Sequence, residues 1–404
     1  MPTFFYTAKS LEGEVHSGTA EAKDERILAR DLRNQGYILV KAEVKRKVRI
    51  GKMDFSIPFL GVSAKEKLFF TRNLRIMITT GMSLPRALDT LATVSKNKKF
   101  KDALLKIKGE IIKGKTFSES LEAFPNIFSE LFCNMVKAGE ESGTLEDVLK
   151  SLTHQIEREV ELKSKIIGAL IYPAVILCAM IGIGILMLVI VVPNLAAVFK
   201  DLGMELPITT RCVIFLGTFM AEKWYLFILI LIAFAFLFRM TLKSKKGKKK
   251  LDALLLKIPV ISSLIKKTNT AFTSRTLSSL ISAGIPIVRG LEITANSLTN
   301  FYHKKALNEA AKKVEKGEKL SDILMSYLDI YPLTIVQMIK VGEETGETAE
   351  ILGKMADFYE EEVSNATKNL SSIIEPVLML IIGGAVGFFA VSMIQPMYSM
   401  MGAM

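Results

Sequence analysis

The chain has 404 residues, of which half are hydrophobic and 23% are charged, and its formal net charge is +12. A mean hydropathy of +0.33 with so many charges argues against a transporter built mostly from membrane helices. It is typical of a few membrane helices joined to substantial aqueous domains. The basic residues crowd beside apolar segments, where they set membrane orientation, so we expect no nucleic-acid partner.

No pattern of cysteine or histidine residues in the sequence indicates a catalytic site or a metal site. The cysteines Cys133, Cys178 and Cys212 lack the spacing of a metal site, and the three histidines share no motif. We therefore predict no catalytic residue, no cofactor-binding residue and no metal ligand, and we do not expect an enzyme. The N-terminus has no basic segment followed by an apolar one, so we expect the chain to start in the cytoplasm without a signal peptide.

The first 44 residues predict a small α+β module. Apolar residues alternate with polar ones in two segments, which is typical of strands. Asp24 is a suitable helix cap, Gly36 a suitable helix end, and Tyr37–Val44 reads as a third strand. We expect a ββαβ module over 1–44, followed by a linker over 45–62.

The rest of the chain repeats itself. Shifted by 203 positions, Phe69 to Pro193 lies over Phe272 to Pro396 without a gap. A period this long indicates two copies of a whole domain. Each copy begins with amphipathic helices and ends in a long apolar segment, so we predict helical bundles over 63–165 and 266–370, each with its own membrane anchor.

Local signals place the ends of some helices in the first copy. Ser63 and Glu66 have the spacing of a capping box, and so do Thr144 and Asp147. The helix that begins after Thr144 has no stop signal before the apolar segment. We expect it to run directly into the first membrane span.

One segment matches the phosphate-binding pattern G-x-x-x-x-G-K-[ST]. It is Gly109–Thr116, and it leaves open an alternative function, a membrane transporter or ATPase subunit that binds nucleotide there. A phosphate-binding loop follows a buried strand, whereas this segment continues an amphipathic helix. Gly114 fits a helix end, and Thr116 with Glu119 fits a capping box for the next helix. The second copy has Gly317-Glu318-Lys319 at this place and lacks the pattern, so we favour a helix end.

A short acidic element is present in both copies. It is Gly139-Glu140-Glu141-Ser142-Gly143 in the first and Gly342-Glu343-Glu344-Thr345-Gly346 in the second. One interpretation is a turn with its last glycine in left-handed conformation. The other is a surface for docking or for a metal, because two carboxylates stand side by side. The candidate docking or coupling residues are Gly139, Glu140, Glu141, Gly143, Gly342, Glu343, Glu344 and Gly346.

Three segments are candidates for membrane spans. Two of them, 166–193 and 371–397, contain long charge-free stretches, since no residue is charged from 166 to 199 or from 376 to 404 and each stretch exceeds the ~20 residues that a bilayer requires. The middle one, 213–238, contains Glu222 and Lys223, which leaves a re-entrant or interfacial helix as an alternative. The residues expected to shape the membrane helices are Pro173, Pro193, Glu375, Pro376 and Pro396.

Positive charge predicts the topology. Seven lysines and arginines follow the middle span closely, whereas few precede it, so its C-terminal end faces the cytoplasm. The middle span then returns the chain between two anchors that both lead outward. We expect an extracytoplasmic loop over 194–212, a basic cytoplasmic linker over 239–265 and an extracytoplasmic tail over 398–404.

Together these residues resemble the polytopic inner-membrane platform of type IV pilus and type II secretion machines, the F/PilC family. The resemblance covers nearly the whole chain. The segments that carry it are Gly81-Met82-Ser83-Leu84, the two Gly-Glu-x-x-Gly turns, Gly168 to Pro173, Val192-Pro193, Glu205-Leu206-Pro207, Glu375-Pro376 with Pro396, and Phe5-Tyr6-Thr7-Ala8 with Gly13 and Gly36.

The resemblance implies a multi-pass protein of the bacterial inner membrane and no catalysis. It implies a homo-oligomer that contacts a hexameric secretion or pilus ATPase, the transmembrane helices of pilin or pseudopilin, other inner-membrane assembly subunits and membrane lipid. Such a platform couples the ATPase to extraction of pilin and assembly of a filament. Pilus extension, competence pseudopili and protein secretion share it. The overall expectation is a mainly α protein with two duplicated cytoplasmic bundles, three transmembrane helices and a small N-terminal module.

Overall fold

A computed structural model describes residues 3–10, 15–22, 24–44, 61–194, 197 and 208–401. The chain forms two compact units, Met1–Leu60 and Gly61–Met404. Most of the expected linker over 45–62 and of the expected loop over 194–212 lies outside the described residues, as do residues 402–404 of the expected tail.

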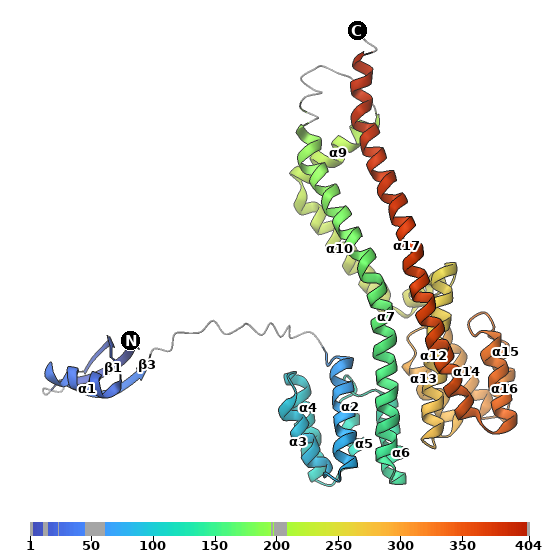
Figure 1. The fold of residues 1–404 in the computed structure, drawn as a ribbon, viewed down its shortest axis with the longest axis horizontal. Coiled ribbons are helices and arrows are strands. Elements are labelled where there is room, and N and C mark those ends of the chain that lie inside the picture. Colours follow the sequence, from blue (N-terminus) through green and yellow to red (C-terminus); the bar gives the residue numbers. More distant parts are fainter. Residues whose placement is uncertain are drawn as a thin grey trace. The chain divides into compact units, whose positions relative to one another are not determined.

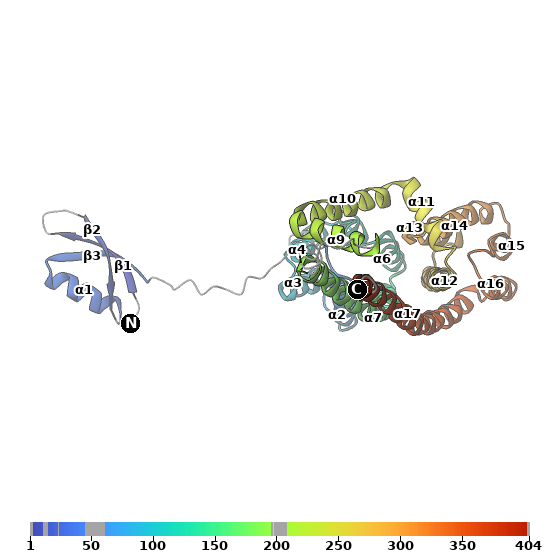
Figure 2. The same cartoon turned by 90° about the horizontal axis from the view of Figure 1, so that it is seen from above.

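The N-terminal unit has the ββαβ order that the sequence predicted (Figure 2). Its antiparallel sheet has the order β2-β1-β3. The carboxylate of Asp24 accepts the N–H of Ile27 at 2.9 Å and caps the helix. Ala8 on the sheet and Leu28 and Leu32 on the helix form its small core. The elements are β1 (Thr3–Ser10), β2 (Val15–Glu21), α1 (Glu25–Asn34) and β3 (Tyr37–Val44).

All regular secondary structure in the described residues of the second unit is helical, and the repeat is visible in its helix bounds (Figure 1). The first copy consists of α2 (Ala64–Thr79), α3 (Leu84–Val94), α4 (Lys98–Ile112), α5 (Phe117–Glu122), α6 (Glu130–Ser142) and α7 (Leu145–Leu186). The second copy consists of α12 (Pro259–Ser282), α13 (Ile287–Ser297), α14 (Phe301–Val314), α15 (Leu320–Met325), α16 (Leu333–Thr345) and α17 (Thr348–Met401). Each helix from α3 to α7 begins 203 residues before its counterpart, for example at residues 84 and 287. The mainly α fold with a duplicated helical domain is therefore confirmed.

The two copies pack against the same helix, α7. Helix α7 packs against α2 of its own copy and also against α12 and α17 of the other (Figure 1). The apolar core of the first copy includes Leu280, Ile285 and Ile293 from the second. The side chain of Gln155 on α7 donates to the hydroxyl of Thr276 at 3.2 Å. The two bundles are thus parts of one compact unit.

Two helices continue far beyond the bundles, and for α7 the sequence predicted this continuation. Helices α7 and α17 leave the bundles in the same direction (Figure 1). By length and composition, Leu145–Asn194 and Thr348–Ile394 could cross a membrane. Only 6% and 17% of their most apolar windows are buried, so these helices are not covered by protein as the core helices of a soluble domain are.

The middle apolar segment differs from the expectation. A single helix over 213–238 is wrong, because the segment forms α9 (Ile208–Glu222) and α10 (Trp224–Lys243), which are separated at Lys223. The adjacent charges of Glu222 and Lys223 interrupt the apolar surface at this point. Helix α9 packs against the π-helical turn η1 (Met187–Val191), where the carbonyl of Leu188 lies 2.5 Å from the place of a Cβ on Gly217.

The basic segment after α10 is also more ordered than expected. The linker predicted over 239–265 is wrong as a structural description, because it contains the end of α10, helix α11 (Lys245–Leu255) and the start of α12. The carboxylate of Asp252 in α11 accepts the N–H of Phe301 at 2.8 Å, which attaches α11 to the start of α14. The expected tail from 398 is likewise helical as far as Met401.

Candidate functional site

The duplicated acidic element holds the N-terminus of a short helix. In the first copy the carboxylate of Glu140 accepts the N–H of Phe117 at 2.6 Å and of Ser118 at 2.8 Å. These amides belong to the first turn of α5, where backbone N–H groups have no partner within the helix. A carboxylate is also favoured there by the helix dipole. Glu140 therefore joins α6 to α5.

The second copy repeats this arrangement. The carboxylate of Glu343 accepts the N–H of Leu320 at 2.6 Å and of Ser321 at 3.1 Å. It also accepts the hydroxyl of Ser321 at 2.6 Å. The contact spans about 23 residues of sequence in both copies, and it is built into the repeat.

The glycines of the element are required by close contacts and by backbone conformation. A Cβ on Gly139 would lie 2.9 Å from a methyl group of Val148, and one on Gly342 would lie 2.9 Å from the Cα of Thr348. The last glycines, Gly143 and Gly346, have φ of 73° and 79°, the left-handed conformation expected for a turn.

The capping box predicted at Thr144 and Asp147 is wrong. The side chain of Thr144 makes no cap hydrogen bond to the backbone of α7. Its hydroxyl lies 2.7 Å from the hydroxyl of Ser142 instead. The tight turn around Gly143 therefore directs this side chain back to α6, away from the amides that it was expected to accept.

The second glutamates of the elements face outward. Glu141 and Glu344 are exposed, and the nearest cation to Glu141 is Lys137 at 4.0 Å. The two carboxylates of each element thus have different surroundings, one at a helix N-terminus and one at the surface. Among the described residues no group of three or more His, Cys, Asp or Glu could hold a metal ion. Of the four glutamates in these elements, Glu141 and Glu344 are the exposed ones.

The phosphate-binding pattern lies at a helix end. Glu110 in α4 binds Lys113 at 2.8 Å and Lys115 at 2.7 Å. Hydrogen bonds from these two lysines lower the pKa of Glu110 to about 2. Gly114 has φ of 95°, and Thr116 caps α5. The described strands all belong to the N-terminal unit, so the strand that such a loop requires does not precede α4.

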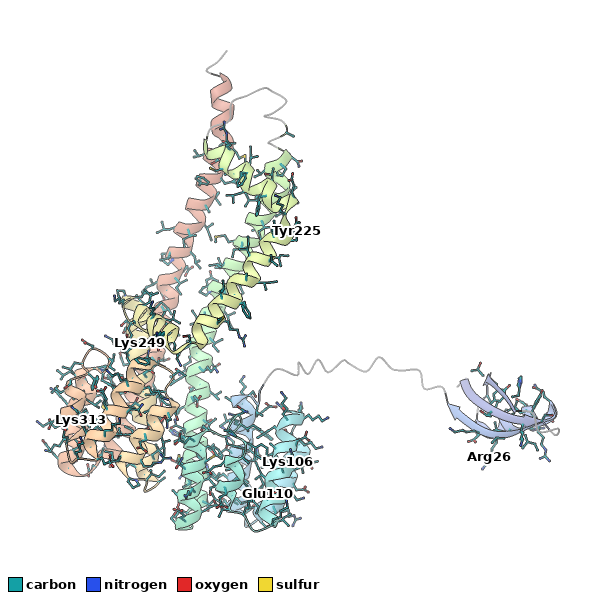
Figure 3. All side chains as sticks on the ribbon, turned by 180° about the vertical axis from the view of Figure 1, so that it is seen from behind. Arg26, Lys106, Glu110, Tyr225, Lys249 and Lys313 are labelled. Atoms are coloured by element: carbon teal, nitrogen blue, oxygen red, sulfur yellow. The ribbon has the colours of Figure 1, made fainter. Side chains whose placement is uncertain are left out.

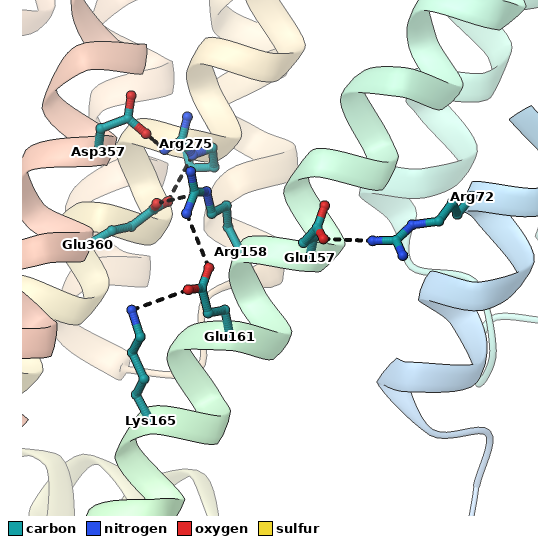
Figure 4. Close-up of polar contacts among 8 residues, drawn as sticks. All are labelled: Arg72, Glu157, Arg158, Glu161, Lys165, Arg275, Asp357 and Glu360. Atoms are coloured by element: carbon teal, nitrogen blue, oxygen red, sulfur yellow. Dashed lines mark hydrogen bonds and ion pairs between the residues drawn. The ribbon is translucent and has the colours of Figure 1, made fainter.

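An arginine–glutamate pair also occurs in both copies, and sequence reasoning missed it. Arg72 binds Glu157 at 2.6 Å, and Arg275 binds Glu360 at 2.8 Å (Figure 4). Both members of the second pair stand 203 positions after those of the first, so the repeat offset was the signal that could have found it. The side chains of the first pair are 51% and 46% exposed, whereas those of the second are both 10% exposed.

The second pair is buried because α7 lies over it. Arg158 of α7 approaches Glu360 to 3.6 Å and also binds Glu161 at 3.1 Å. Arg275 forms a further ion pair with Asp357 (Figure 4). This network connects α7, α12 and α17 at the place where the two long helices leave the bundles.

The residues expected to shape the membrane helices lie within or beside them. Pro173 is inside α7, and Glu375 and Pro376 are inside α17, with Glu375 exposed. Pro193 follows the π-helical turn η1 closely. Because proline has no N–H to donate, a widened turn before it is an expected adjustment. Helix α17 also passes through the position of Pro396.

Comparison with known families matches "Type II secretion system (T2SS), protein F" twice, over residues 70–193 and 273–396. The second range starts 203 residues after the first, at residue 273 against residue 70. Residues 1–43 match the family's N-terminal domain. The chain is 34% identical to "Type IV pilus assembly protein PilC" of Thermus thermophilus, with 100% of this chain and 99% of the relative covered. It is 34% identical to the PilC protein of Myxococcus xanthus over 99% of this chain and 95% of the relative. It is 31% identical to "Type II secretion system protein F" of Xanthomonas campestris, with both chains covered completely.

Proposed function

Because the chain belongs to the type II secretion system protein F family, we propose that it is the inner-membrane platform of a type IV pilus or type II secretion machine. In this function it couples a cytoplasmic hexameric ATPase to extraction of pilin or pseudopilin and to filament assembly. It acts as a non-enzymatic component. Relatives named for pilus assembly and for type II secretion both match it over their full length, which supports either machine.

The observation that carries the proposal is the continuity of α7 and α17. Each helix begins inside a folded bundle and extends into a long apolar segment. Apart from the bonds missing at its prolines, a continuous helix keeps its backbone hydrogen bonds, so a rotation or shift of the bundle displaces the apolar end as well. Arg158 of α7 lies 3.6 Å from Glu360 of α17 and helps hold the two helices together at their base, where Glu360 also binds Arg275 of α12.

The direction of α10 supports the proposed topology. Tyr225 lies at the end of α10 that is far from the bundles, and Lys249 of α11 lies beside them (Figure 3). The chain thus returns towards the bundles through α10, into a segment rich in lysine. Lysine-rich flanks are retained on the cytoplasmic side. We infer that the N-terminus and both bundles are cytoplasmic and that α17 ends outside.

The partners follow from this arrangement. The bundles are the part that an ATPase can reach, and the exposed Glu141 and Glu344 are candidates for its docking surface. The exposed apolar residues of α7 and α17 are candidates for contact with lipid and with the transmembrane helices of pilin. Neighbouring platform copies and other inner-membrane subunits complete the assembly.

Site-specific photo-crosslinking in the host cell tests the proposal. A crosslinker at position 141 or 344 should capture the ATPase, and one at Val386 in α17, which is 62% exposed, should capture pilin or pseudopilin. Replacing both Glu141 and Glu344 by lysine should weaken the ATPase crosslink, whereas the control Lys106→Glu on α4 (Figure 3) should leave it unchanged. Absence of both partners from the crosslinked products would contradict the proposal.

The alternative of a nucleotide-driven transporter has a separate test. If Gly109–Thr116 were a nucleotide site, the purified protein would hydrolyse ATP and Lys115→Ala would abolish the activity. We expect no binding of nucleotide that depends on Lys115, because its ammonium group is bound to Glu110 at 2.7 Å.

A further inference from the structure

A groove on the second copy is covered on one side by a helix of the first. It is a pocket of about 380 Å³ between α7 and the second bundle. Phe272, Leu298 and Thr299 line its bundle side, and Gln155 and Leu162 of α7 line the other. Helix α7 thus packs along this groove and leaves a pocket beside it, and we call it the filled groove.

The same groove occurs on the first copy. It is a pocket of about 410 Å³ to which Phe69, Ser95 and Lys96 contribute. These residues stand 203 positions before Phe272, Leu298 and Thr299. The groove on the first copy is open and apolar. Phe69 is 52% exposed, Val94 55%, and Ile76 on the same helix as Phe69 52%.

Helix α17 carries the face that corresponds to the filling face of α7. Position 155 of α7 corresponds to Phe358 of α17, which is 49% exposed. In the filled groove the amide of Gln155 bonds to Thr276 at 3.2 Å and to Ser279 at 3.3 Å.

In the open groove the corresponding positions are Asn73 and Ile76. The polar pair of Gln155 and Ser279 therefore becomes an apolar pair, Phe358 and Ile76, and both members are exposed in a single chain. A change from polar to apolar on both sides of a contact preserves its complementarity.

The charges change in a matched way. Thr268, Asn269 and Thr299 of the filled groove become Lys65, Glu66 and Lys96 in the open one, a net gain of one positive charge. Arg158 and Glu159 of α7 correspond to Glu361 and Glu362 of α17, and Glu362 also binds Lys267 of its own chain at 2.6 Å. The open groove is thus more basic than the filled one, and the corresponding face of α17 is more acidic than that of α7. Opposite charges on two surfaces favour their association.

We propose that the open groove of the first repeat receives the Phe358 face of α17 from a second copy of this chain. The contact repeats between molecules the packing that joins the two repeats within one molecule. Because α7 and α17 leave the bundles in the same direction, the contact keeps every copy in the same orientation across a membrane. It joins unlike surfaces, so the assembly is head-to-tail and closes into a ring if the rotation permits.

The proposal specifies the homo-oligomer part of the proposed function, but it rests on the repeat alone. It is tested with purified full-length protein, without an ATPase or pilin. A failure here would leave the crosslinks to those partners unaffected, and a failure of those crosslinks would leave this contact unaffected.

Disulfide crosslinking in detergent or liposomes is the test, with Cys133, Cys178 and Cys212 replaced by alanine. Protein carrying Asn73→Cys is mixed with protein carrying Phe358→Cys and oxidised. A covalent dimer should form only in the mixture, and one chain carrying both changes should form a ladder of higher oligomers. The intramolecular pair Gln155→Cys with Thr276→Cys is the positive control, and Lys106→Cys mixed with Phe358→Cys is the negative control.

A second measurement uses a variant that keeps the fold. Ile76→Glu changes an exposed side chain, so the chain should stay folded by circular dichroism and lose the higher oligomers in native mass spectrometry. Two results would overturn the proposal. One is a positive control that crosslinks while the mixture does not, and the other is a dimer of Phe358→Cys alone, which would indicate a two-fold contact.

Discussion

The repeated arginine–glutamate pair allows one substitution to be made in two environments. In the monomeric chain, Arg275→Ala removes the partner of Glu360 where both side chains are 10% exposed. Arg72→Ala removes the partner of Glu157 at the corresponding place, where the two side chains are 51% and 46% exposed. The chemical change is identical, so a difference in the free energy of unfolding reports the different surroundings of the two arginines, namely the greater burial of Arg275 and its further ion pair with Asp357.

Burial sets the expected magnitude. Removing one partner of a buried ion pair leaves an uncompensated charge and costs about 3–5 kcal/mol. Glu360 retains Arg158 at 3.6 Å, so we expect the lower end, about 3 kcal/mol, for Arg275→Ala. An exposed pair contributes about 0.2–1 kcal/mol, so we expect less than about 1 kcal/mol for Arg72→Ala.

Denaturant unfolding in detergent, followed by far-ultraviolet circular dichroism, measures both variants. Replacing both members of the buried pair by apolar residues, as in Arg275→Met with Glu360→Leu, should recover much of the loss because no unpaired charge remains. Equal losses for Arg275→Ala and Arg72→Ala would refute the reasoning. So would a double variant less stable than Arg275→Ala.

Three further predictions concern the bundles. Glu343→Gln should lower the free energy of unfolding by about 2 kcal/mol, because an amide cannot replace the charged acceptor of two N–H groups. The control Glu344→Gln should change it by less than about 0.5 kcal/mol. Equal denaturation midpoints for the two variants would contradict this. Burial lowers the pKa of His303 to about 4 from 6.5, so the unfolded chain binds the proton more readily, and stability should fall by up to about 3 kcal/mol as the pH drops through that window. Replacement by phenylalanine, which the first repeat carries at this position, should reduce that pH dependence in thermal unfolding, and an unchanged dependence would assign it elsewhere. Gly342→Ala places a Cβ 2.9 Å from the Cα of Thr348 and should lower the free energy of unfolding by about 1–3 kcal/mol. Gly109→Ala, whose Cβ would have nothing within 4 Å, should raise it by about 0.5–1 kcal/mol. Changes of the same sign in the free energy of unfolding would contradict this account of the packing.

Features encoded locally could be predicted from the sequence. The capping boxes at Ser63 and Thr116 are present, because a cap depends on residues three positions apart. The left-handed glycines follow from their place after a helix. The repeat itself predicted helices with matching starts, since a gapless duplication preserves every spacing.

Features set by tertiary contacts could not be predicted. The partners of Glu140 lie 22 and 23 residues away on another helix, and no local pattern specifies them. Helix α7 packs against helices of both copies, and these contacts depend on how the two repeats pack together. The break at Lys223 shows that mean hydropathy does not determine helix continuity, because it separates α9 from α10 inside one largely apolar segment.

Deletion of the gene in its host tests the platform function most directly. The account predicts that a clean deletion, in a strain without a second gene of this family, abolishes surface filaments or secretion. The full-length protein should restore them. The double variant Arg275→Ala with Glu360→Ala, which lacks the buried ion pair, should restore them less well than the double variant Arg72→Ala with Glu157→Ala, which lacks the exposed one. Normal filament assembly and normal secretion in the deletion strain would contradict the account.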